Sequence, residues 1–180
     1  MKAPGKMPLW VALYDLADLA EGEARIVLEP DAAQRAAIAA WTGLAGLEAL
    51  TVRVLLVSLG EGHYRYEGSL AANVVQQCVV TLEPVRNTIA RDFQRRYRVV
   101  GRTRAPKGAA MPAADDGEDG EAPEEVRGRK LDLAAPVVEE LSLGIDPYPR
   151  AEGAVFEASG EPGTRADNPF AVLKSLKKGR

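Results

Sequence analysis

The sequence predicts an α+β fold: an antiparallel sheet, either open or barrel-like, with two covering helices, a disordered acidic insert and a short C-terminal tail helix. Segments between residues 9 and 100 alternate apolar and polar residues, as strands do, and two segments have helical spacing of apolar residues. A length of 180 residues with 46% hydrophobic content suits one domain plus appendages. We therefore expect a single domain of residues 1–102 and 128–150, interrupted by the insert 103–127 and followed by a flexible basic tail, 151–180.

The N-terminal part predicts two strands and a helix. Residues 9–14 and 23–28 are short apolar segments, and Gly22 is available for a turn between them. Asp31 stands where a helix N-cap is expected, with Gln34 three residues later in the pattern of a capping box. A helix is expected over residues 32–42, ended by Gly43.

The middle of the chain predicts three further strands. Residues 51–59 are rich in β-branched residues, and glycines at 60 and 62 favour a turn into a partner strand at 63–71. Residues 75–82 alternate again, so Cys78, Val80 and Leu82 would share one core-facing side. Glu83 and Pro84 would end this strand, because proline has no N–H to donate to a sheet.

Residues 85–100 fit both a helix and a strand. Their large apolar residues recur every four positions, which gives a helical stripe but also places them on one face of a strand. A strand would put Arg91 and Arg95 on the apolar face, whereas a helix would separate them from it. Periodicity leaves both alternatives open.

Charge is segregated along the chain, although the formal net charge is only −3. Between Arg86 and Lys107 there are eight basic residues and one acid, Asp92. Arginines interleaved with Phe93 and Tyr97 could contact RNA phosphates and stack on bases. The alternative is an exposed face whose charges maintain solubility and are balanced by the acidic insert. The candidate RNA-binding arginines are Arg86, Arg91, Arg95, Arg96 and Arg98.

The insert at 103–127 is rich in proline, glycine, alanine and acids. Seven of the eleven residues from Asp115 to Glu125 are acidic, and large apolar side chains are nearly absent. Such a segment cannot bury enough surface to offset its ordering entropy, so we expect disorder. It could cover the arginines until RNA displaces it.

A second helix is expected at residues 134–144, with Pro136 in its first turn. The adjacent carboxylates Glu139 and Glu140 point in different directions on a helix and are interpreted as solvated.

The tail predicts a short helix with Asn168 as N-cap and Pro169 as first residue. It is either a peptide that docks a partner or a helix that packs back on its own sheet. The candidate partner-binding residues are Phe170, Leu173 and Leu176, and the candidate RNA-binding lysines are Lys174, Lys177 and Lys178.

Catalytic and metal chemistry have little support in the sequence. One cysteine and one histidine cannot make an internal disulfide or a Cys/His zinc site, and no phosphate-binding glycine-rich loop or His-Glu-x-x-His pattern is present. Cys78 is most simply a small buried residue, and His63 a structural one. We expect a non-enzymatic protein without a metal or cofactor. No apolar run is long enough for a membrane helix or a signal peptide, so a cytoplasmic location without membrane contact is expected.

Three blocks of the sequence carry a recognisable pattern: Cys78 to Val85, which contains Leu82, Glu83 and Pro84; residues 131–149; and the terminal block that begins with Asn168 and Pro169. Together they resemble the YceD family, the large ribosomal RNA subunit accumulation proteins, in the form found in alphaproteobacteria. Many relatives carry a second cysteine where this chain has Thr81, so the resemblance implies no metal site or disulfide here. It also favours a strand for residues 85–100.

The resemblance implies a role in the accumulation or processing of 23S rRNA without an established catalytic activity. The first hypothesis is a ribosome-biogenesis factor that binds the 23S precursor or an assembling large-subunit particle. The alternative is a protein–protein adaptor that docks a ribosomal protein or a nuclease through its tail, with an indirect effect on rRNA.

Overall fold

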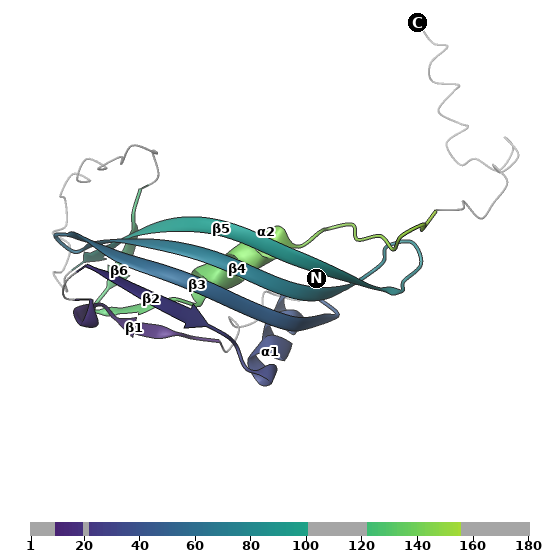
Figure 1. The fold of residues 1–180 in the computed structure, drawn as a ribbon, viewed down its shortest axis with the longest axis horizontal. Helices are drawn as coiled ribbons and strands as arrows, with labels where there is room; N and C mark the ends of the chain where they lie inside the picture. Colours follow the sequence, from purple (N-terminus) through teal and green to yellow (C-terminus); the bar gives the residue numbers. More distant parts are fainter. Residues whose placement is uncertain (1–9, 20–21, 101–121, 156–180) are drawn as a thin grey trace, which may run out of the picture.

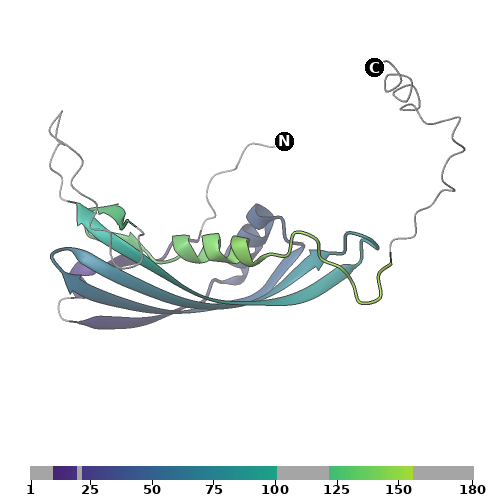
Figure 2. The same ribbon diagram turned by 90° about the horizontal axis from the view of Figure 1, so that it is seen from above.

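The computed structural model describes residues 10–19, 22–100 and 122–155, and these form an α+β domain. Its main sheet has five strands in the order β2-β3-β4-β5-β6, and it is not closed. The sheet is therefore open, and a barrel-like closure is not confirmed. A two-stranded sheet of β1 and β7 completes the strand set of the described residues. Figure 2 shows both helices, α1 and α2, on the same side of the main sheet.

Three long consecutive strands make the body of the sheet: β3 (Gly46–Gly60), β4 (His63–Gln77) and β5 (Pro84–Val100) (Figure 1). They pair antiparallel, and β4 pairs with β5 along its whole length from His63 opposite Arg98 to Gln77 opposite Pro84. Between β3 and β4, Glu61 and Gly62 have φ angles of 51° and 77°, as a two-residue hairpin turn requires. The strand prediction for residues 85–100 is confirmed.

The helix predicted at residues 32–42 is confirmed as α1 (Ala32–Thr42). The Gln34 N–H donates to Asp31 Oδ1 at 2.8 Å, and the Asp31 N–H donates to Gln34 Oε1 at 2.8 Å. Gly43 ends the helix with a φ of 75°, a left-handed conformation that glycine adopts without a Cβ clash.

The strands at the N-terminus differ from the prediction. β1 (Leu13–Asp15) pairs with β7 (Lys130–Asp132) instead of turning into β2 (Glu23–Leu28), which is an edge strand beside β3. A single-turn 3₁₀ helix at Leu16–Asp18 follows β1. The partner of β1 lies more than a hundred residues away in the sequence, so local patterns could not identify it.

The strand predicted at residues 75–82 is wrong in its second half. β4 ends at Gln77, and the chain turns at residues 78–81 before β5 begins. Cys78 is fully buried, but Leu82 is 65% exposed and has a φ of 64°, which no strand residue adopts. The alternation of apolar residues therefore continues past the end of the strand.

Part of the predicted insert is ordered as β6 (Glu124–Arg127), which pairs parallel with the end of β5. The expected disorder is therefore wrong for these residues, whose backbone hydrogen bonds go to β5. The rest of the prediction, at 101–121, lies outside the described residues. The second helix is confirmed as α2 (Ala135–Gly144), with Pro136 in its first turn.

The core lies between the helices and the facing side of the sheet. It takes Leu50, Val52, Val54 and Leu56 from β3 and alternate residues of β4, with Val137 and Leu141 from α2. Tyr66 is fully buried, its ring stacks on Phe93 with centroids 5.6 Å apart, and its hydroxyl donates to the Leu133 carbonyl oxygen at 3.0 Å. Among the described residues, no helix or further strand covers the opposite face of the sheet in Figure 2.

Candidate functional site

The five arginines predicted to bind RNA do not share one surface. All lie on β5, where successive side chains point to opposite faces of the sheet. Arg91 and Arg95 stand opposite the core residues Leu70 and Tyr66, so they point toward α2. Arg86, Arg96 and Arg98 point to the uncovered side, which we call the open face.

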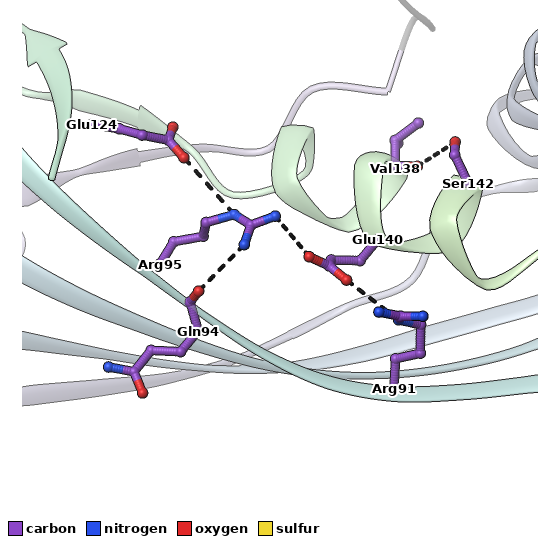
Figure 3. Close-up of polar contacts among 7 residues, drawn as sticks. All are labelled: Arg91, Gln94, Arg95, Glu124, Val138, Glu140 and Ser142. Carbon is purple, nitrogen blue, oxygen red and sulfur yellow. Dashed lines mark hydrogen bonds and ion pairs between the residues drawn. The ribbon is translucent and has the colours of Figure 1, made fainter. Parts of the chain in front are cut away.

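On the covered side, Glu140 of α2 joins Arg91 and Arg95 (Figure 3). Its Oε1 lies 2.6 Å from Arg95 Nη2 and its Oε2 lies 3.3 Å from Arg91 Nε. The Glu140 side chain is only 6% exposed, so the prediction that it is solvated is wrong, whereas Glu139 is exposed as expected. Arg95 Nε also lies 3.8 Å from Glu124 Oε1 on β6. Arg91 and Arg95 therefore join β5 to α2, and Arg95 also joins it to β6.

On the open face, arginines of β5 are paired with acids of other strands. Arg86 Nε lies 3.1 Å from Glu48 Oε1, and Arg98 Nη2 lies 2.9 Å from Glu125 Oε1. Each partner is at least one-third exposed. Such exposed pairs contribute about 0–1 kcal/mol, so a phosphate can replace the carboxylate at little cost.

Further arginines on the open face, among them Arg25 of β2, were not predicted as candidates. Arg53 on β3 and Arg65 on β4 share the face with Arg96 and Arg98, because Arg65 pairs in register with Arg96. The signal was present in the alternation of β3 and β4, where these arginines fall between core positions.

The open face is hollowed across its middle. A depression of about 680 Å³ spans β2 to β5. Arginines line it from β2 and β3, and acids line it from β4 and β5. The charged side chains are Arg25, Arg53, Glu67 and Asp92. The face therefore carries both signs of charge, unlike a uniformly basic RNA-binding groove.

The turn between β4 and β5 is built around Cys78. Its Sγ accepts hydrogen bonds from the backbone N–H groups of Val80 at 3.4 Å, Thr81 at 3.3 Å and Ala151 at 3.3 Å. A hydrogen bond from the Thr81 side chain, followed by backbone N–H donors, lowers the thiol pKa from 9.0 to about 6. Burial of Cys78 is confirmed, but the sulfur is also a polar acceptor that joins the turn to the segment after α2.

The tail candidates lie outside the described residues. They comprise Asn168, Pro169, Phe170, Leu173, Lys174, Leu176, Lys177 and Lys178. Within residues 10–19, 22–100 and 122–155, no group of three or more His, Cys, Asp or Glu side chains is arranged to hold a metal ion. In the same part of the chain, no helix has the length and apolar character needed to cross a lipid bilayer.

A family model described as "Large ribosomal RNA subunit accumulation protein YceD" matches residues 66–177. The chain belongs to the YceD family. The match begins within β4, includes the Cys78 turn, β5 and α2, and extends into the tail. The YceD family name links the chain to accumulation of large-subunit ribosomal RNA. No curated protein and no solved structure matches the chain.

Proposed function

We propose that this protein supports accumulation of 23S rRNA as a non-enzymatic factor that binds the rRNA precursor or the assembling large-subunit particle. The observation that carries the proposal is the open sheet face, which carries exposed and half-buried arginines on the adjacent strands β3, β4 and β5. An open sheet face with several guanidinium groups can contact phosphates of a structured RNA without reading its sequence.

The two faces of β5 divide the candidate arginines by role. Arg91 and Arg95 are held by the buried Glu140 carboxylate, and their release would leave that charge without a partner. Arg86, Arg96 and Arg98 face solvent, and with the tail lysines Lys174, Lys177 and Lys178 they are the RNA contacts that we propose.

The sharpest test compares charge reversals at matched sites. The double substitution Arg96→Glu and Arg98→Glu should weaken binding to 23S precursor RNA or to immature large-subunit particles. It should also reduce the slope of log affinity against log salt by roughly one for each phosphate that the variant no longer neutralises. The control is the double substitution Arg129→Glu and Lys130→Glu. It changes the net charge of the protein by the same amount at a site that follows β6 in the sequence. Equal affinity and slope for both double variants would exclude direct RNA binding by the open face.

One observation favours the adaptor alternative. The predicted arginines Arg86, Arg91, Arg95 and Arg98 form ion pairs with carboxylates of the same chain, which reduces the net positive charge available to RNA. An adaptor would act through a ribosomal protein or a nuclease. Affinity purification with and without RNase distinguishes the two functions, because an adaptor keeps its protein partners after RNA is digested.

A further inference from the structure

We propose that an exposed apolar patch at the β4–β5 turn is the docking surface for residues 168–178 of the same chain. The patch consists of Val79, Leu82 and Tyr148, and we call it the turn patch. Its side chains are 46%, 65% and 72% exposed, respectively. Grouped large apolar side chains at the surface of a domain commonly mark a contact site.

The three residues of the turn patch lie on two segments, the β4–β5 turn and the segment after α2, which hydrogen bonds join. The Val79 N–H donates to the Pro149 carbonyl oxygen at 2.9 Å, which places the residue next to Tyr148 beside the turn. The Leu82 N–H donates to the Cys78 carbonyl oxygen at 3.0 Å, and the Ala151 N–H donates to the Cys78 Sγ. Figures 1 and 2 both show the segment after α2 running alongside this turn.

Leu82 itself indicates a role for its side chain. A leucine at a φ of 64° carries a steric penalty that glycine avoids and asparagine largely avoids. The side chain is mostly exposed, so its packing within the described domain contributes little stabilising free energy to offset this penalty. An energetically unfavourable conformation that displays an apolar side chain points to a contact made by that side chain.

The chain's own tail matches the turn patch in chemistry. Residues 168–178 carry Phe170, Leu173 and Leu176 at helical spacing, followed by a basic end. Three exposed carboxylates lie within four residues of Leu82 or Tyr148 in the sequence, against two arginines, Arg86 and Arg150. The acids are Glu83, Asp146 and Glu152, and the tail supplies Lys174, Lys177 and Lys178.

The chain leaves the described domain beside the turn patch. Thirteen positions separate Val155 from Asn168, which can span at most about 45 Å. A tether of this length gives an effective concentration on the order of millimolar, so even a weak contact is populated. Docking goes beyond the proposed RNA binding, because a docked tail and RNA would compete for the same tail lysines.

The test uses the full-length protein with a nitroxide label on Ser175→Cys, since Cys78 is fully buried and its labelling can be checked by mass spectrometry. Paramagnetic broadening should remove most of the amide intensity of Val79, Leu82 and Tyr148, while the amides of His63 and Arg98 at the other end of the sheet keep theirs. Uniform weak broadening, or none at the turn patch, would overturn the proposal.

Leu82→Asn supplies the matched variant, because asparagine tolerates the left-handed conformation but lacks the apolar side chain. It should restore the lost intensities without changing the methyl shifts of the core. The control Val27→Asn, at a 62% exposed position on β2, should leave the broadening intact. If both variants restore the amide intensities, or if neither does, the turn patch is not the docking surface of the tail.

A sample that mixes two differently labelled forms of the protein shows whether the docked tail belongs to the same chain or to a second copy. Isotope-labelled protein without nitroxide is combined with unlabelled protein that carries it. Broadening at the turn patch in this mixture would mean that a second copy's tail docks there, which would overturn docking within one chain. The measurements contain no RNA, so their outcome is separate from that of the RNA-binding test.

Discussion

Arg95 on β5 and Glu140 on α2 form an ion pair at 2.6 Å in which the carboxylate side chain is 6% exposed and the guanidinium 20% exposed. Arg91 binds the other carboxylate oxygen, so one acid of the helix neutralises two bases of the strand. A buried charge in such an arrangement is stable only while its partners remain.

Replacing Glu140 with Gln should destabilise the domain. The substitution leaves two arginines facing the helix without their carboxylate, and we expect the free energy of unfolding to fall by about 2–4 kcal/mol, discounted for the partial exposure of Arg91. Urea denaturation measures the change. Glu139→Gln, one residue away and exposed, should alter stability by less than about 0.5 kcal/mol. Similar losses in both variants would mean that the pairing has no special energetic role.

The stability of the domain should depend on pH through Cys78. The native thiol pKa is lowered to about 6 from 9.0, so the native state binds fewer protons than the unfolded state between these values. This contribution is complete above pH 9 and is lost as the pH falls through 6. The free energy of unfolding should therefore rise from pH 6 to pH 9 more steeply in the native protein than in Cys78→Ser, which accepts hydrogen bonds but does not titrate. Parallel curves would show that the thiol remains protonated.

Gly68 should not tolerate alanine. An added Cβ would lie 2.3 Å from Phe93 Cζ, so the aromatic ring would have to move, at a cost of about 1–3 kcal/mol. Gly46→Ala on β3 is the matched control, because its Cβ would lie 3.6 Å from Val75, an ordinary contact. Thermal unfolding compares the two variants. If the clash with Phe93 is the cause, Phe93→Leu should recover part of the loss in the Gly68→Ala background.

Asp31→Ala should remove the N-cap of α1 and reduce stability by about 1 kcal/mol, because the Gln34 N–H loses its acceptor. Asp92→Ala, on the open face, is the control for loss of one exposed carboxylate. Equal unfolding midpoints of the two variants in urea would show that the capping box contributes nothing measurable.

Features with local causes could be predicted from the sequence. The limits of α1 follow from Asp31, Gln34 and Gly43, all within one helix length, and the β3–β4 turn follows from two glycines that permit positive φ angles. For β5 the four-residue spacing of large apolar side chains did not exclude a helix. The pairing with β4 along the whole strand decides that question.

The features that were missed depend on distant residues. Glu140 is buried because Arg95, 45 residues earlier, lies beneath it, and an adjacent acid on the same helix is exposed. Likewise, the turn that follows β4 is joined by hydrogen bonds to Pro149 and Ala151, the latter 73 residues after Cys78. The acidic composition around Glu124 predicted disorder, but Arg95 and Arg98 supply the opposite charges for β6.

The parallel pairing of β6 with the end of β5 determines how far the intervening chain must travel. Tyr97 stands level with Glu124, so the chain leaving Val100 has only to step back about 10 Å along the sheet and one strand across. A much shorter connection would close this gap, and loop-closure entropy changes only slowly with length. The segment between the two strands can therefore be lengthened or shortened in evolution with little effect on the sheet.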